Sequence, residues 1–253
     1  MADFKGTREA FAQAIIDMAE TDDKIMFVSP DSLKAMRATK FAELHPEQYV
    51  EVGISEQAAV DVASGLAASG LTPFVGTYAG FMTMRACEQM RTFVAYPNLN
   101  VKFVGINSGL LGGEREGVTH QFYEDIGILS NIPNFTILTP ADGPQTYHAV
   151  KAAAEIPGPV YVRAGSGREN DVYEKRCSFY HGRNSYPERI WGRYPSSLQR
   201  LCAGQSAESC GHSKENGVHV TVGRCKILSM QRTPSKVLEA IKKGKEDCDG
   251  GRP

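Results

Sequence analysis

Long apolar runs are missing from this sequence, and so are the short motifs that identify many enzymes. No stretch of about 18 apolar residues occurs, which argues against a transmembrane helix. The opening MADFKGTREAF is polar and charged, unlike a basic segment followed by an apolar one. P-loop, HExxH and CxxC patterns are absent, and the formal net charge is only −1. We therefore expect a cytoplasmic protein that binds neither nucleic acid nor membranes.

Charge and cysteine are distributed unevenly along the chain. Residues 176–253 hold 14 Lys/Arg against 7 Asp/Glu, whereas residues 1–175 hold 14 against 22. Five of the six cysteines and the single tryptophan, Trp191, also fall in the later part. A chain of 253 residues can form one large or two modest domains, so this contrast predicts two parts with different properties.

The first part alternates short apolar strands with longer helical stretches. Apolar spacing predicts one helix that begins near Ser55 and Glu56, and others over residues 7–20, 32–44, 81–95 and 143–155. Strands are predicted over residues 24–28, 49–52, 72–76, 100–107, 135–138 and 159–163. This alternation predicts an α/β fold, a parallel sheet with helices on both faces. Ligands bind such sheets at the carboxyl ends of the strands, so the candidate loops lie around Glu56, around Tyr78 and over 108–120.

The stretch VGISEQAAVDVASGLAASG, residues 52–70, places one carboxylate at the start of a small-sided helix. In a purely structural interpretation Ser55 caps the helix, and Glu56 faces the positive end of the helix dipole, a contribution of about 0.3–1 kcal/mol. In a functional interpretation the carboxylate serves a bound ligand. The stretch by itself leaves both interpretations open.

Five segments, in order and at matching spacing, resemble the pyrimidine-binding domain of the transketolase family of thiamine diphosphate enzymes. They are VGISEQ (52–57), VGTYAGFMTMRACEQMR (75–91), GGEREGVTHQFYEDIGILSNIPN (112–134), TPADG (139–143) and YVRAGSGRE (161–169). The resemblance covers residues 1–172, apart from the first few. It implies the carboxyl-terminal subunit of a split transketolase, which transfers a two-carbon ketol unit between sugar phosphates.

The same resemblance implies roles in cofactor binding and activation. Glu56 matches the family's glutamate that hydrogen-bonds a ring nitrogen of the aminopyrimidine, so that the thiazolium carbon can lose its proton. Tyr78 and Phe81 match aromatic residues that pack on the pyrimidine, a contact that adds about 0.5–1.5 kcal/mol beyond burial. Met84 stands where another aromatic residue is common in the family, so this side of the pyrimidine site is expected to be more flexible than an aromatic residue would make it.

Four further residues match substrate positions of the family. His120, after a glycine-rich loop, matches a histidine that faces the substrate and is an acid–base candidate. Glu116 replaces an aspartate that reads a sugar hydroxyl. Arg163 matches an arginine that binds a sugar phosphate, and Ser108 holds the place of a histidine that shares this contact.

The family's GDG signature for diphosphate and metal is absent here, since Asp142-Gly143 and Asp249-Gly250 have the wrong context. The resemblance therefore implies an amino-terminal partner subunit that carries the diphosphate and Mg²⁺ site, together with a second copy of this chain. No metal ligand is expected in this chain, and the isolated chain is expected to be inactive.

The second part, residues 173–253, matches the family only in patches, at 214–222 and 236–245. Residues 177–213 have no sustained apolar period. The segments IWGRYP, GRCKIL and KEDCDGGRP can each be back-translated with codons chosen from the degenerate set. When the reading frame of these codons is shifted by one base, each segment encodes a family-like peptide. We expect an incomplete or disordered remnant of the family's carboxyl-terminal α/β domain, read in a displaced frame. The cysteine spacings fit no common zinc pattern, and the basic excess lacks a nucleic-acid-binding fold.

Alternatives within the enzyme class are a 1-deoxyxylulose-phosphate synthase and a 2-oxo-acid dehydrogenase β-type subunit. An alternative outside it is a non-catalytic protein, either a damaged gene product or a scaffold that keeps the domain for assembly.

Overall fold

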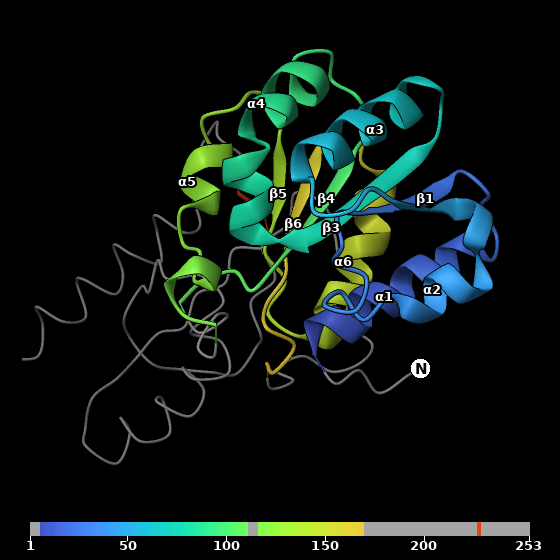
Figure 1. Cartoon of the computed structure of the whole chain (residues 1–253), viewed down its shortest axis with the longest axis horizontal. Coiled ribbons are helices and arrows are strands. Elements are labelled where there is room, and N and C mark those ends of the chain that lie inside the picture. The colour runs from blue at the N-terminus through green and yellow to red at the C-terminus, as the bar shows by residue number, and fades with distance from the viewer. Residues whose placement is uncertain (1–5, 111–115, 170–226, 229–253) are drawn as a thin grey trace, which may run out of the picture.

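A single twisted sheet organises the part of the chain that the computed structural model describes, residues 6–110, 116–169 and 227–228 (Figure 1). The strand order is β2-β1-β3-β4-β6-β5-β7. Strands β1 to β6 pair in parallel with their neighbours. Among the described strands, β7 alone is antiparallel, and it pairs with β5. The bounds are β1 Ile25–Ser29, β2 Tyr49–Glu51, β3 Thr72–Tyr78, β4 Lys102–Ile106, β5 Thr136–Leu138, β6 Val160–Arg163 and β7 Ile227–Leu228.

Helices cover both faces of this sheet, as the sequence predicts (Figure 1). They are α1 Thr7–Ala19, α2 Thr39–Leu44, α3 Glu56–Ala68, α4 Cys87–Gln89, α5 Asp125–Leu129 and α6 Gly143–Glu155. Short 3₁₀ turns form η1 Pro46–Gln48 and η4 Val118–His120, and π-helical turns form η2 Phe81–Arg85 and η3 Met90–Ala95. One core cluster joins α1, α2 and α6 to the sheet, and a second joins α3, η2 and η3 to its other face. Because β1 and β4 are buried at every position, apolar packing on both sides holds the sheet.

A buried lysine fastens the amino end of β4. Lys102 Nζ donates to Asn100 Oδ1 and the Ile156 carbonyl oxygen, both at 2.6 Å, and to the Gly158 carbonyl oxygen at 2.8 Å. Burial lowers the pKa of Lys102 to about 7. The ammonium group replaces lost hydration with three acceptors, and so ties β4 to the turn between α6 and β6.

Two predicted helices differ in the structure. The helix expected over 32–44 is reduced to α2, because Asp31 and Arg37 have positive φ angles, 53° and 60°. The Ser32 hydroxyl donates to the Pro30 carbonyl oxygen at 3.1 Å, which favours turns over a helix. The helix expected over 81–95 is split into η2, α4 and η3.

The helix predicted over 143–155 has the predicted bounds, for a clear local reason. Asp142 is its N-cap residue, and its Oδ1 accepts from Gln145 N at 2.9 Å. Pro144 in the first turn has no amide hydrogen that would need a partner. Asp142 thus has a structural role at this helix.

The predicted boundary at residue 172 and the frame-displaced remnant over 173–253 lie outside the described residues, apart from 227–228. Within the described part of the chain, no helix is both long and apolar enough to cross a membrane.

Candidate active site

Three aromatic side chains meet at the carboxyl edge of the sheet. Tyr78 ends β3, Phe81 begins η2, and His120 ends η4, well beyond the end of β4. Ring centroids are 5.3 Å apart for Tyr78–Phe81, 4.8 Å for Tyr78–His120 and 5.1 Å for Phe81–His120. Each side chain is partly exposed. Two of the loops that the sequence nominated separately therefore form one surface, which we call the aromatic cluster (Tyr78, Phe81, His120).

Phe122 supports this cluster from behind. Its ring lies 5.5 Å from that of Phe81 and stacks directly over Gly80, where an added Cβ would stand 1.8 Å from the Phe122 ring. Any side chain at position 80 would therefore have to displace this ring. His120 Nδ1 lies 3.0 Å from Thr119 Oγ1, so a neighbouring hydroxyl can orient the imidazole.

Glu56 is the first residue of α3, and its carboxylate is buried, with 6% of the residue exposed. Ser55 occupies the N-cap position but makes no side-chain capping hydrogen bond. The capping interpretation of this stretch therefore lacks its main contact. Glu56 Oε1 instead accepts from Arg85 Nη1 at 2.9 Å.

Arg85 connects Glu56 to the aromatic cluster. Its guanidinium carbon lies 3.8 Å from the centroid of the Phe81 ring. Its backbone carbonyl accepts from Gln57 Nε2 at 3.0 Å, which ties η2 to α3. Arg85 was not among the site residues predicted from the sequence, although it lies in the family-like segment 75–91, and only its position four residues after Phe81 could have suggested it.

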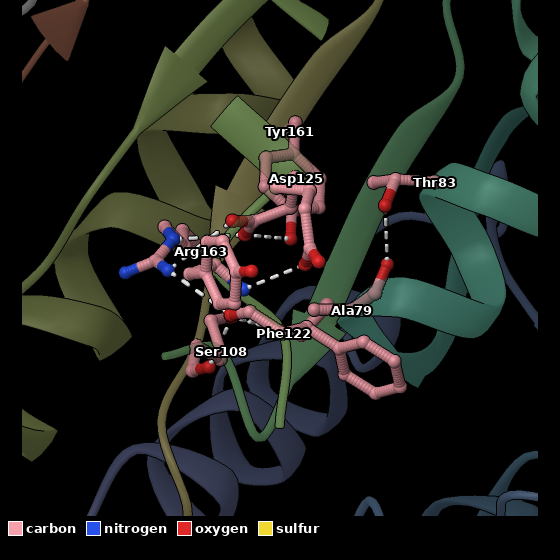
Figure 2. Close-up of polar contacts among 11 residues, drawn as sticks. Ala79, Thr83, Ser108, Phe122, Asp125, Tyr161 and Arg163 are labelled. Atoms are coloured by element: carbon pink, nitrogen blue, oxygen red, sulfur yellow. Dashed lines mark hydrogen bonds and ion pairs between the residues drawn. The ribbon is translucent and has the colours of Figure 1, made fainter. Parts of the chain in front are cut away.

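Arg163 lies inside the protein, at the carboxyl end of β6, with 4% of the residue exposed. Figure 2 shows its guanidinium against the carboxylate of Asp125, with Nε–Oδ2 at 2.8 Å and Nη2–Oδ1 at 3.2 Å. Tyr161 donates to the same carboxylate at 2.8 Å, and burial raises the pKa of Tyr161 well above its ordinary value. Two of its three nitrogens face Asp125, and no bound substrate tests the rest, so the predicted role of Arg163 in substrate binding stays a prediction.

The other predicted substrate and cofactor residues differ in exposure. Ser108 is buried, and its hydroxyl lies 3.0 Å from the Gly105 carbonyl oxygen and 2.8 Å from that of Ala164, which links β4 to β6. Glu116 is exposed, and the preceding residues 111–115 are outside the described residues. Met84 is 43% exposed and projects from η2. Their predicted roles stay predictions.

A second arginine that sequence reasoning missed stands near this edge. Arg8 Nη1 donates to the Ala35 carbonyl oxygen at 3.2 Å, and its Nη2 donates to Asn107 Oδ1. Burial lowers the pKa of Arg8, while Tyr78 and Glu116 act in the opposite direction. Arg8 Nε and Asn107 Nδ2 are buried donors with no hydrogen-bond acceptor in the described structure, so they suit an oxygen-rich ligand.

Within residues 6–110 and 116–169 no group of three or more His, Cys, Asp or Glu side chains could hold a metal ion. The described site thus consists of a buried carboxylate, an aromatic surface and arginines at the carboxyl edge of a parallel sheet. This arrangement is typical of the ligand-binding edge of an α/β domain.

Comparison with known proteins places the chain in one family of such domains. Residues 5–167 match the family described as "Transketolase, pyrimidine binding domain". The chain belongs to this family.

Curated relatives agree with this membership. The chain is 34% identical to a "Putative transketolase C-terminal section" of Methanocaldococcus jannaschii, over 68% of this chain and 54% of that protein. It is 32% identical to a subunit of an apulose-4-phosphate transketolase of Phocaeicola vulgatus, over 95% of this chain and 75% of that protein. It is 38% identical to a 1-deoxy-D-xylulose-5-phosphate synthase of Macrococcus caseolyticus, over 62% of this chain and 25% of that one. The match spans only about half the length of the archaeal relative.

Among solved structures, the fold is similar to that of a split-gene transketolase described as an inactive beta4 tetramer. The TM-score is 0.75 at 32% identity, with 89% of this chain and 73% of that chain covered. The predicted fold class is confirmed for the pyrimidine-binding part.

Proposed function

We propose that this chain is the carboxyl-terminal subunit of a split transketolase that transfers a two-carbon ketol unit between sugar phosphates. The observation that carries the proposal is the position of Glu56. Its buried carboxylate lies at the start of α3 and is joined through Arg85 to the face of Phe81. A hydrogen-bonding carboxylate beside an aromatic face suits a flat, nitrogen-bearing ring. Relatives named as transketolase subunits support the same conclusion.

The residues of this chain fit thiamine diphosphate at one end of the cofactor. When bound, the cofactor supplies a carbon nucleophile that protein side chains lack. Glu56 would hydrogen-bond a pyrimidine nitrogen, with little water to compete because the residue is buried. Tyr78, Phe81 and Met84 would flank the ring and exclude water from it.

Substrate contacts belong to the residues beyond the cofactor ring. His120, which lies against both Tyr78 and Phe81, is the proposed group that exchanges protons with a substrate hydroxyl. Glu116 is the proposed hydrogen-bond partner of a sugar hydroxyl. Ser108 and Arg163 line the ends of β4 and β6 behind these groups.

The diphosphate and Mg²⁺ are proposed to bind an amino-terminal partner subunit, and a second copy of this chain completes the assembly. This division follows from the lack of a GDG signature in the sequence. Two phosphates need a divalent cation held by oxygen ligands, which the partner would provide.

The test is to produce the full chain with its amino-terminal partner and to measure thiamine-diphosphate-dependent ketol transfer. Glu56→Gln should lower turnover by about 10²–10⁴-fold, the usual loss for an acid–base group. Glu88→Gln is the matched control, because Glu88 is an exposed glutamate on α4, directly after η2. Turnover of Glu56→Gln within about threefold of the parent, roughly 0.6 kcal/mol, would reject the role of Glu56.

A second candidate is a 1-deoxy-D-xylulose-5-phosphate synthase activity, favoured by the 38% identity to one such enzyme. Product analysis of the two-subunit complex separates the two, since a synthase would form 1-deoxy-D-xylulose 5-phosphate. A 2-oxo-acid dehydrogenase β-type role would instead give oxidative decarboxylation of a 2-oxo acid. A complex inactive in all three assays would favour a non-catalytic protein.

A further inference from the structure

Arg85 lies where a flat ligand of Glu56 and Phe81 would lie. Its guanidinium covers a face of Phe81, with Cζ 3.8 Å from the ring centroid, and donates to Glu56 Oε1 at 2.9 Å. The other rings around Phe81 are steeply inclined to it, at 59° for Tyr78, 72° for His120 and 70° for Phe122. Among the described residues, Arg85 is the group whose guanidinium carbon lies over the face of the Phe81 ring.

These are the two contacts that the proposed function assigns to the aminopyrimidine. A guanidinium is planar and delocalised, stacks on aromatic rings and donates in-plane hydrogen bonds to carboxylates. An aminopyrimidine ring that bonds Glu56 is also planar and needs an aromatic face. The two groups cannot cover the same face of the Phe81 ring at once, so they compete wherever the aminopyrimidine takes the face that Arg85 covers.

We propose that Arg85 is a placeholder for the aminopyrimidine, which pairs with Glu56 and covers Phe81 until the cofactor displaces it. The inference rests on the proposed function. The placeholder also gives the buried Glu56 carboxylate a charged hydrogen-bond partner, which a buried polar group needs. Arg85 provides that partner while the ligand is absent.

The placeholder can move at small cost. The Arg85 side chain is 50% exposed, against 7% for that of Glu56, so solvent can receive the displaced guanidinium. Its backbone stays fixed, because Gln57 Nε2 holds its carbonyl. Half-exposed ion pairs and exposed cation–π contacts are weak, so competition from Arg85 should reduce cofactor affinity by about fivefold to thirtyfold.

The experiment measures thiamine diphosphate binding by calorimetry, with Mg²⁺, in the full chain assembled with its amino-terminal partner. Arg85→Met keeps most of the side-chain length and removes the charge, so it should bind the cofactor about fivefold to thirtyfold more tightly than the parent. Arg91→Met is the matched control: Arg91 is exposed in η3, and no side-chain hydrogen bond of it is present among the described residues, so binding should be unchanged. Unchanged or weaker binding in Arg85→Met would overturn the proposal.

A second variant guards against poor folding of Arg85→Met. Arg85→Lys keeps the charge but loses the planar guanidinium, and should bind the cofactor more tightly than the parent by a smaller factor.

A third variant tests the displaced group directly. In the shorter variant Arg85→Ala, added guanidinium ion should compete with the cofactor, whereas in the parent it should have little effect. Absence of competition in Arg85→Ala would count against the placeholder. A parent complex that binds no thiamine diphosphate at all would instead refute the proposed function.

Discussion

Replacement of Arg163 by methionine tests whether this arginine is a structural partner of Asp125 or a ligand of substrate phosphate. Both side chains are nearly inaccessible, at 5% and 0% exposure, and they are joined by two contacts of 2.8 and 3.2 Å. Arg163→Met would leave the Asp125 carboxylate in the interior, where Tyr161 still donates to it (Figure 2). Breaking a buried pair on one side costs about 3–5 kcal/mol.

That cost is a large share of the roughly 5–15 kcal/mol by which a typical domain is stable, so the effect should be easy to measure. Urea unfolding followed by far-ultraviolet circular dichroism gives the free energy of unfolding, and Arg163→Met should lose about 3–5 kcal/mol. The double variant Arg163→Met with Asp125→Leu removes both charges and should recover much of this loss. In the two-subunit complex, kcat/KM should fall by the same factor for phosphorylated and unphosphorylated acceptor sugars.

The opposite pattern would refute this reasoning. If the free energy of unfolding of Arg163→Met is within about 1 kcal/mol of that of the parent, the pair with Asp125 contributes little to stability. If kcat/KM also falls by more than about tenfold for phosphorylated acceptors alone, roughly 1.4 kcal/mol, Arg163 contacts the phosphate as the family resemblance implies.

Four further outcomes are expected. The isolated chain should bind thiamine diphosphate weakly or not at all, because the proposed diphosphate and metal ligands lie in the partner; micromolar binding by calorimetry would contradict the split site. Gly80→Ala should destabilise the fold by about 1–3 kcal/mol, since its Cβ would stand 1.8 Å from the rigid ring of Phe122; an unchanged urea midpoint would show that the ring can move aside. Burial and the bond to Asp17 raise the pKa of Tyr147 to about 12, so its contribution to stability is complete below about pH 10 and lost as the pH rises through 12. The loss of stability over that interval should be shallower in Tyr147→Phe, and equal slopes would argue against the shift. For residues 177–253 we expect codons that give family-like peptides in the neighbouring frame; a gene without them, or limited proteolysis that leaves this part intact, would defeat the displaced-frame interpretation.

Local patterns were sufficient for most of the described architecture. The helix over 143–155 was predicted with its observed bounds, because Asp142 and Pro144 define its start in the sequence itself. The stretch 32–44 was harder, since its apolar spacing favours a helix while Asp31 and Arg37 adopt positive φ angles. Tertiary contacts such as Ser32 with Thr77, at 2.7 Å, select the turns there.

The sequence by itself determined that this is an α/β domain of the transketolase pyrimidine-binding family, and it nominated Glu56, Phe81 and His120. Hydrophobic periodicity along the chain is enough to predict the α/β fold, and the order of the motifs carries the family resemblance that implies roles for these residues. Only the tertiary structure decided how the charges pair. Arg85 meets Glu56 across 29 residues, and Arg163 meets Asp125 across 38. Such pairs form because the parallel sheet brings the carboxyl ends of distant strands to one edge, where buried charges must find a partner in space and not in sequence.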